Sequence, residues 1–200
     1  MTRMKRSFDV IFSLLGLVIL APVLAAIALA VRHKDGGAVV HRAMRVGFRG
    51  EPFCLYKFRT MVPNAAALGG PLTVGTDTRI TRVGKMLRRW KLDELPQLFN
   101  VLRGDMSLVG PRPEAVEIAA DYTADQRRIF DLVPGITDPA SIRFVDENAL
   151  LAGVPDPDSY YLRTIVPEKV RLNLEYAARA TMFSDSATIL RTLWRLGRSS

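Results

Sequence analysis

Two adjacent carboxylates, Asp93 and Glu94, stand in a stretch otherwise rich in cations, LRRWKLDELPQLFNVLRGDM over residues 87–106. The cations that precede them at close quarters are Arg82, Lys85, Arg88, Arg89 and Lys91. Clustered cations can gather a diphosphate, while a carboxylate beside them can hold Mg²⁺ or attack a phosphorus atom. These residue types therefore suit phosphate chemistry at Asp93, with Glu94 in metal positioning or proton handling.

The same two residues also fit the start of a helix. A helix is predicted over about residues 94–103, with Gly104 as its stop. Its apolar stripe would consist of Leu95, Leu98, Phe99 and Leu102. Asp93 would then be the N-cap and accept free backbone N–H groups, with Pro96 in the first turn. The spacing by itself leaves capping and catalysis both open.

A second candidate for phosphate binding is Arg112, which stands between two prolines in GDMSLVGPRP, residues 104–113. Prolines on both sides stiffen the backbone, and a rigidly held guanidinium suits bidentate phosphate recognition. The alternative is an ordinary turn with a surface arginine. A further rigid turn is predicted over residues 134–139, PGITDP, with Arg143 shortly after it.

The elements that must position these residues follow from local patterns. The segment over residues 52–61, PFCLYKFRTM, reads as a strand or extended segment that carries Lys57 and Arg59. Glycines and prolines over residues 62–78 predict a loop. A helix over about residues 79–91 would carry Arg88, with an apolar face made of Ile80, Val83, Leu87 and Trp90.

Two more helices are predicted near the C-terminus, over about residues 167–179 and 185–196. In the last one, Trp194 and several leucines share the helix with Arg191 and Arg195. That pattern fits an interfacial helix lying on anionic lipid, and equally a terminal helix that packs on a core.

Length and charge set broad limits on the class of protein. The 200 residues suit one domain, and the net charge of +8 favours an anionic partner: nucleic acid, a membrane surface or a phosphorylated substrate. A soluble basic protein would have the same balance. The single cysteine, Cys54, excludes an internal disulfide framework.

The N-terminal segment is apolar and uncharged from Val10 to Val31, and a helix of that length would extend roughly 33 Å, about a bilayer core. A signal peptide is one reading, although the segment is longer than the usual core of such a peptide. A spanning helix and a re-entrant helix remain. Pro22 near the middle, and basic residues on both flanks, favour a re-entrant helix with both ends in the cytoplasm. Proline kinks also occur in ordinary spanning helices, so the sequence alone leaves these two readings about equal.

Taken together, these segments resemble the bacterial sugar transferase family, the monotopic phosphoglycosyl transferases. The stretches that carry the resemblance are RVG (45–47), KFRTM (57–61), LDELPQLFNVLRGDMSLVGPRP (92–113) and PGIT (134–137). They occur in the family's order after the kinked apolar segment, and the resemblance covers almost the whole chain. Longer members carry an extra multi-helix membrane region for which this chain has no room, so we expect the short form.

The resemblance implies an α/β fold: a small, mostly helical catalytic domain with a short sheet (residues 36–200) on a re-entrant membrane helix (residues 1–35), with interfacial amphipathic helices. It implies transfer of a sugar-1-phosphate from a UDP-sugar to undecaprenyl phosphate, with release of UMP, at the cytoplasmic face of the bacterial inner membrane. Asp93 matches the family's covalent nucleophile, and Mg²⁺ is expected at Asp93 and Glu94. The residues expected to bind substrate phosphate are Arg112, Lys57, Arg59, Arg88 and Arg143.

Three positions depart from the family's pattern. Ala21 stands where many members have serine before the proline, no glutamine precedes Arg45-Val46-Gly47, and Asp138 follows the PGIT stretch in place of glycine. Donor preference is therefore left open, as are the pathway and the oligomeric state, a homodimer included.

Two rival hypotheses remain beside the enzyme. A membrane-anchored, non-enzymatic binder of anionic lipid or nucleic acid would share the positive charge. The aromatic residues make up only 8% of the chain and are not interleaved with the cations, so nucleic acid is not expected as a partner. A degenerate family member with a scaffolding role is the other, and the intact Asp-Glu and Pro-Arg-Pro motifs argue against it.

Overall fold

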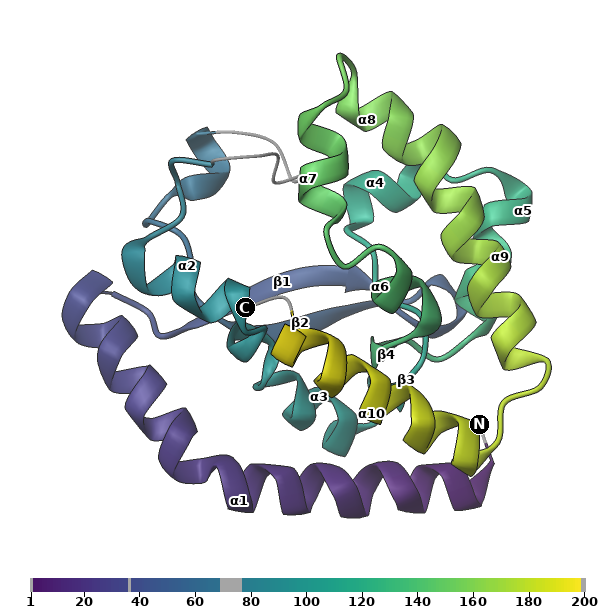
Figure 1. The fold of residues 1–200 in the computed structure, drawn as a ribbon, viewed down its shortest axis with the longest axis horizontal. Coiled ribbons are helices and arrows are strands. Elements are labelled where there is room, and N and C mark those ends of the chain that lie inside the picture. Colours follow the sequence, from purple (N-terminus) through teal and green to yellow (C-terminus); the bar gives the residue numbers. More distant parts are fainter. Residues whose placement is uncertain (1, 36, 69–76, 199–200) are drawn as a thin grey trace.

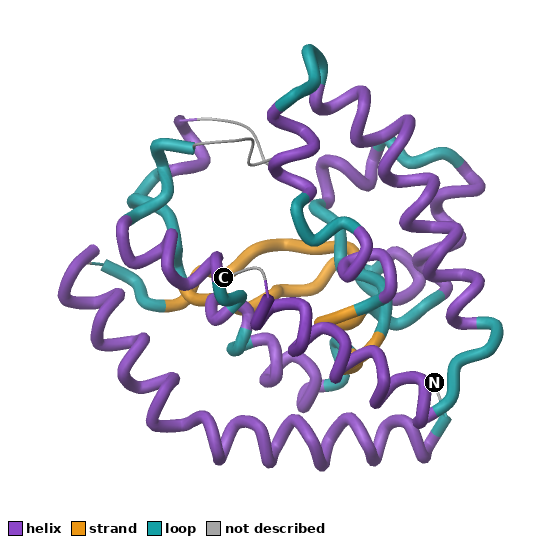
Figure 2. The backbone as a smooth tube through the Cα atoms, in the orientation of Figure 1, coloured by secondary structure: helices purple, strands orange, loops and turns teal. Residues whose placement is uncertain are grey.

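The structure is a computed structural model, and it describes residues 2–35, 37–68 and 77–198. Its helices and strands, in chain order, are α1 (Arg3–Asp35), β1 (Val40–Val46), β2 (Pro52–Phe58), α2 (Arg82–Arg89), α3 (Gln97–Arg103), β3 (Ser107–Val109), α4 (Val116–Ala120), α5 (Ala124–Arg127), β4 (Gly135–Thr137), α6 (Pro139–Arg143), α7 (Glu147–Ala152), α8 (Pro157–Tyr160), α9 (Val166–Ala177) and α10 (Met182–Arg198). Figure 2 shows the strands in the middle of the molecule with helices around them. The predicted class, mostly helical with a short sheet, is confirmed.

The first sheet is the antiparallel hairpin of β1 and β2. The predicted strand over residues 52–61 is confirmed as β2, which ends at Phe58; its partner β1 was not predicted. The outer edge of β2 is completed by a side chain of α3, because Asn100 accepts from the N–H of Tyr56 at 3.0 Å and donates to the carbonyl of Cys54 at 2.7 Å. This amide takes the place of a third strand and fixes α3 against the hairpin.

The second sheet is the parallel pair of β3 and β4. The rigid turn predicted over residues 134–139 is therefore wrong in part, since Gly135–Thr137 forms β4. The backbones of these two segments approach so closely that a Cβ on Gly135 would lie 2.1 Å from the backbone nitrogen of Gly110. Asp138 then caps α6 by accepting from the N–H groups of Ala140 and Ser141.

Helix α2 confirms the helix predicted over residues 79–91, in shorter form. Thr81 is its N-cap and accepts from the N–H of Gly84. Leu87 is buried as predicted, whereas Trp90, predicted on the apolar face, follows the helix and is 42% exposed. The predicted loop over residues 62–78 contains a short 3-10 helix, Ala65–Leu68, and its part over residues 69–76 lies outside the described residues.

Helix α1 is continuous through Pro22 and bends along its length (Figure 1). It is long and apolar enough to cross a membrane, from Arg3 to Lys34. Near its N-terminal end Arg6 donates to the carbonyls of Val101 and Leu102, at 2.5 and 2.7 Å, in the last turn of α3.

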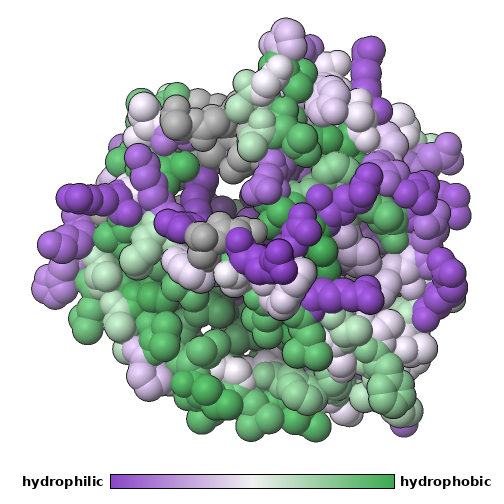
Figure 3. All heavy atoms as spheres, in the orientation of Figure 1, coloured by the Kyte–Doolittle hydropathy of each residue, from purple (hydrophilic) through white to green (hydrophobic). Residues whose placement is uncertain are grey.

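The other end of α1 also packs on the domain. Ile27 and Val31 are buried in one cluster with Phe58 and Leu87. The opposite side of α1 is exposed and strongly apolar, and Figure 3 shows hydrophobic residues gathered along the lower edge, where α1 lies in Figure 1. Its exposed large residues are Met4, Ile11, Phe12, Leu14, Leu15, Val18, Ile19, Val23 and Leu29.

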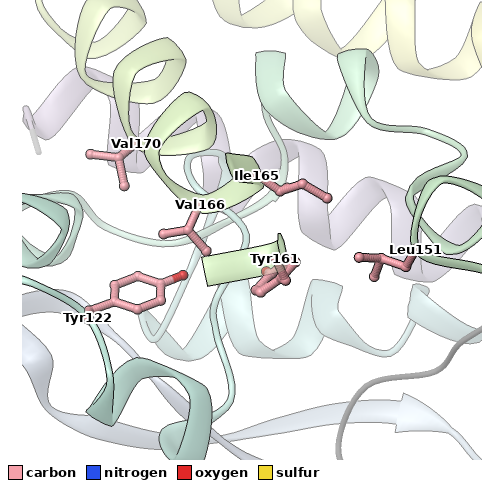
Figure 4. Close-up of a cluster of buried hydrophobic side chains, with 6 residues drawn as sticks. All are labelled: Tyr122, Leu151, Tyr161, Ile165, Val166 and Val170. Atoms are coloured by element: carbon pink, nitrogen blue, oxygen red, sulfur yellow. The ribbon is translucent and has the colours of Figure 1, made fainter. Parts of the chain in front are cut away.

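The predicted C-terminal helices are confirmed as α9 and α10. Figure 4 shows the buried cluster to which α9 contributes Val166 and Val170, packed with Tyr122, Tyr161 and Leu151. Helix α10 buries Asp185 and Thr188 against the domain, and much of its remaining surface is exposed. The exposed large apolar residues of α10 are Met182, Phe183, Leu190, Leu193 and Trp194.

Candidate active site

The two adjacent carboxylates lie in a tight 3-10 turn, Leu92–Glu94, between α2 and α3. Lys91, just before the turn, has a φ of 53° in the left-handed region, which reverses the chain after α2. The prediction that Asp93 caps α3 is therefore wrong. Helix α3 begins at Gln97 with Pro96 in the N-cap position, so the turn leaves the Asp93 carboxylate free of capping.

Glu94 is held by Arg112 through both of its oxygens. Arg112 Nη2 lies 2.6 Å from Glu94 Oε1, and Nη1 lies 3.0 Å from Oε2, which is the bidentate geometry of an arginine and a carboxylate. Burial alone would raise the pKa of Glu94, but the charge and hydrogen bonds of Arg112 outweigh it and lower that pKa to about 2. Glu94 is thus ionised throughout the ordinary pH range.

Asp93 differs from its neighbour, because its Oδ1 is buried and has no hydrogen-bond partner among the described residues. Burial raises the pKa of Asp93, and the adjacent charge of Glu94 raises it further. The cations Lys57, Lys91 and Arg112 oppose that rise. A buried carboxylate oxygen without a donor is costly unless a ligand supplies one. The Oδ1 of Asp93 is therefore available to bind a ligand or to attack a phosphorus atom.

Lys57 and Arg88 face Asp93 from β2 and α2. Burial lowers the pKa of Lys57 to about 8, and the nearby Arg45 lowers it as well, while Asp93 raises it. Arg88 donates from Nε to Thr60 Oγ1 at 2.9 Å, and Asp93 is the carboxylate that acts most strongly on its charge. The structure thus brings Asp93, Glu94, Arg112, Lys57 and Arg88 together, as expected from the sequence.

The structure places the other two expected residues farther from this group. Arg59 lies beside Gly37, where a Cβ would be 2.7 Å from Arg59 Nη1. Arg143, at the C-terminal end of α6, is 67% exposed in its side chain, and its Nε lies 3.9 Å from Glu168 Oε1. Neither arginine is among the charges that most affect the pKa of Asp93 or Glu94. Their roles in phosphate binding stay predictions.

Two residues that were not predicted as site residues also belong here: Glu114, and Arg45 of the RVG stretch that carries the family resemblance. Arg45 shares one face of the hairpin with Lys57, since its partner Phe53 lies four residues before Lys57 on β2. Glu114 follows Arg112 by two positions in a segment where Pro111, Pro113 and Ala115 are buried, and the residues between them are less so. The available signal was the alternation of apolar and charged residues over residues 111–115, Pro-Arg-Pro-Glu-Ala, which puts Arg112 and Glu114 on the same side of an extended segment.

A magnesium ion fits this site in one specific way. Among the described residues, no group of three or more His, Cys, Asp or Glu could hold a metal on its own. The orphaned Oδ1 of Asp93 is an oxygen ligand of the kind Mg²⁺ prefers, and Mg²⁺ is commonly held by one or two carboxylates plus substrate phosphates. Both oxygens of Glu94 are engaged by Arg112, so Asp93 is the better-placed ligand of the two.

A buried carboxylate with one unsatisfied oxygen and cations around it suits a phosphate ligand, and the same domain has one helix that is long and apolar enough to cross a membrane. The chain belongs to the bacterial sugar transferase family, whose model matches residues 1–199.

Curated relatives support this assignment. The chain is 38% identical over 202 residues to an undecaprenyl-phosphate glucose phosphotransferase of Komagataeibacter xylinus, covering 96% of this chain and 35% of the relative. It is 34% identical over 192 residues to a UDP-glucose:undecaprenyl-phosphate glucose-1-phosphate transferase of Caulobacter vibrioides, covering 94% and 68%. It is 42% identical over 110 residues to a UDP-N-acetylgalactosamine-undecaprenyl-phosphate N-acetylgalactosaminephosphotransferase of Aeromonas hydrophila, covering 55% and 26%. The chain thus spans between about a quarter and two thirds of these three relatives, and their names differ in the sugar.

Proposed function

We propose that this chain transfers a sugar-1-phosphate from a UDP-sugar to undecaprenyl phosphate, giving undecaprenyl diphosphate sugar and UMP. The observation that carries the proposal is the Asp93 carboxylate, buried to 6% exposure with Oδ1 unpaired, next to Lys57, Lys91 and Arg112. Family membership, and the substrates in the names of the relatives, supply the substrate class.

The chemistry divides into two displacements at one phosphorus. An oxygen of Asp93 attacks the sugar-proximal phosphorus, the bond from that phosphorus to the bridging oxygen breaks, and its electron pair leaves with UMP. The oxygen of undecaprenyl phosphate then attacks the same phosphorus and releases Asp93. A covalent intermediate of this kind lets a soluble and a lipid substrate use one site in turn.

The neighbouring residues have supporting roles in this scheme. Arg112, fixed by Glu94, presents a positively charged guanidinium on the side of the site that faces solvent, with its side chain 47% exposed. Lys57 and Arg88 add charge around the reacting phosphate. When bound, Mg²⁺ would neutralise diphosphate charge next to Asp93. Phosphoryl transfer depends mainly on such alignment and charge stabilisation.

The packing of α1 supports a re-entrant helix, and the domain is proposed to lie at the cytoplasmic face of the inner membrane. Lys5, near one end, pairs with Asp185 at 2.5 Å, and Val31, near the other, is fully buried against the same domain. Both ends of the helix thus contact one domain, which would have to lie on one side of the bilayer. The exposed apolar sides of α1 and α10 would then rest in the lipid, with the arginines of α10 near its headgroups.

The test is a transfer reaction with the full chain in detergent, undecaprenyl phosphate and a panel of UDP-sugars. Release of UMP together with a lipid-linked sugar diphosphate is expected for at least one donor. The sugar of that donor is left to the panel, because the relatives are named for glucose and for N-acetylgalactosamine. A folded protein that releases no UMP from any donor would overturn the proposal.

A further inference from the structure

We propose that Arg45 is a further phosphate-binding residue of this site, which receives the phosphate that leaves with UMP, and that Glu114 is the residue that positions it. The inference rests on the proposed function, because it names the group that meets the leaving phosphate of the same reaction.

The first argument is the state of the Arg45 side chain. It is 22% exposed, and its Nε is buried without a hydrogen-bond partner among the described residues. Burial lowers the pKa of Arg45, Glu114 raises it, and the like charge of Arg112 lowers it. A partly buried guanidinium next to Arg112 and Lys57 is unfavourable on its own, and an anion bound between these cations relieves both the repulsion and the unpaired N–H.

The second argument is the way in which Glu114 is held. Its Oε2 accepts from the hydroxyl of Tyr122 at 3.1 Å and also from the hydroxyl of Tyr161, and its Oε1 accepts from the N–H of Ala115 at 3.0 Å. Figure 4 shows these two tyrosines within the buried cluster of the domain. Burial beside Glu114 raises the pKa of both tyrosines, so their hydroxyls stay protonated and donate.

Tyr161, which donates to Glu114, is itself held in place by neighbouring residues. Tyr161 starts a π-helical turn, Tyr161–Ile165, and its hydroxyl also accepts from Lys169 Nζ at 3.1 Å. Arg45 Nη1 lies 3.9 Å from Glu114 Oε1, which is an ion pair but too long for a hydrogen bond. Glu114 therefore orients the guanidinium by charge and does not occupy its donors.

The third argument is the order of the charges. Of the cations that act on Asp93, Lys57 and Arg112 also interact with Arg45. Asp93 itself is not among the charges with the largest effect on Arg45. On the hairpin, Arg45 extends the row of cations beyond Lys57 on the same face, since its partner Phe53 lies four residues before Lys57. A diphosphate whose reacting phosphorus meets Asp93 has its second phosphate next to it, and that phosphate gains negative charge as the bridging bond breaks.

The experiment is a calorimetric titration of the full chain with UMP, using Arg45→Gln and, as a matched control, Arg42→Gln. Arg42 is exposed on the opposite face of the same strand. We expect Arg45→Gln to bind UMP tenfold or more weakly, and to raise the UDP-sugar concentration at which acceptor-free UMP release reaches half of its maximal rate. Arg42→Gln should bind UMP like the parent protein.

The positioning role of Glu114 has its own readout. Glu114→Gln keeps the size of the side chain and should weaken UMP binding, while the double variant with Arg45→Gln should be no weaker than Arg45→Gln alone. A role limited to folding would instead add its loss to that of Arg45→Gln. If Arg45→Gln does not fold, Tyr161→Phe, which removes one donor to Glu114, is expected to weaken UMP binding several-fold, and full affinity there overturns the proposal.

Other outcomes also overturn it. Unchanged UMP affinity in Arg45→Gln of normal thermal stability removes Arg45 from nucleotide binding. Unchanged UMP affinity with a raised KM for undecaprenyl phosphate would assign Arg45 to the acceptor's phosphate and not to the leaving one. A parent protein that transfers normally alongside such results leaves the proposed function intact, whereas a parent protein inactive on every donor contradicts that function itself.

Discussion

Arg112 donates two parallel hydrogen bonds of 2.6 and 3.0 Å to Glu94, which precedes it by 18 positions in the chain. The arginine that the Pro-Arg-Pro motif presents is therefore already paired with protein. Because both Glu94 oxygens are taken, the two adjacent carboxylates have different roles. Glu94 orients the cation, and Asp93 next to it remains open.

This relationship predicts a large effect of Glu94→Gln. The amide removes the charge that holds Arg112, so UMP release should fall about 100-fold or more, and the free energy of unfolding should drop because the buried Glu94 loses its ion pair with the half-exposed Arg112. Rates and thermal unfolding would be measured beside Glu117→Gln, an exposed acid in the first turn of α4. A Glu94→Gln protein as active and as stable as that control would show that the grip on Arg112 has no function.

The shifted pKa of Lys57 predicts the alkaline limit of activity. Lys57 is protonated below its pKa of about 8 and loses its charge as the pH rises through that value. UMP release should therefore decline above about pH 8, and Lys57→Arg, which keeps its charge, should decline at a higher pH. On the acid side the raised pKa of Asp93 should remove the nucleophile at a higher pH than for an ordinary aspartate. The measurement is the rate of UMP release between pH 4 and 10 for the parent protein and Lys57→Arg. If both rates decline at the same alkaline pH, Lys57 is not the group that sets the alkaline limit.

The helices of this fold could be predicted from the sequence because periodic apolar positions decide them. Leu87 in α2 and Val170 in α9 are buried as the pattern requires. Strand β1 could not, since its sequence VHRAMRV has arginines on both faces and no apolar alternation. Strand β4 begins at Gly135, directly after Pro134, and such a pair is typical of a turn; only its pairing with β3 makes it a strand.

The site shows the same division between local and long-range information. The grouping of Asp93 with Arg88 is local, the two flanking prolines indicated Arg112, and the family resemblance added Lys57. The cap predicted at Asp93 failed because Lys91 takes a left-handed conformation, which ends α2 early and inserts a 3-10 turn. Arg112 pairs with Glu94, and Arg45 with Glu114, only because distant segments of the chain pack together. The spacing of residues in the sequence does not predict these pairs.

Helix α2 packs so closely against the backbone of Thr60 that we expect no larger residue to be tolerated at Gly84. A Cβ there would lie 2.1 Å from the backbone oxygen of Thr60, whose side chain accepts from Arg88. Gly84→Ala should therefore lower the free energy of unfolding by about 2 kcal/mol or more and reduce UMP release. The matched control is Gly197→Ala in α10, where a Cβ meets no atom within 4 Å. Equal stability of the two alanine variants would contradict the packing of α2 against Thr60.

The contacts of α1 predict that both of its ends lie on the same side of the bilayer, which the proposed function assigns to the cytoplasm. Arg6 is bound to the end of α3, and Val31 is buried beside Leu87, so neither end can cross the bilayer without breaking these contacts. Single cysteines replacing Thr2 or Ala38, in a Cys54→Ser background, should both be shielded from a periplasmic thiol reagent and react after permeabilisation. Labelling of the residue 2 variant alone from outside would establish a spanning helix.

The covalent role of Asp93 is tested most directly by the intact mass of the protein after incubation with a competent UDP-sugar and Mg²⁺, in the absence of undecaprenyl phosphate. The account predicts a mass increase equal to one sugar phosphate, located on Asp93, with about one UMP released per active site. Adding undecaprenyl phosphate should remove the adduct, and a folded Asp93→Asn protein should never form it. Transfer by the parent protein without an adduct or acceptor-free UMP, or continued transfer by Asp93→Asn, would contradict the account and leave Asp93 a metal-binding or structural residue.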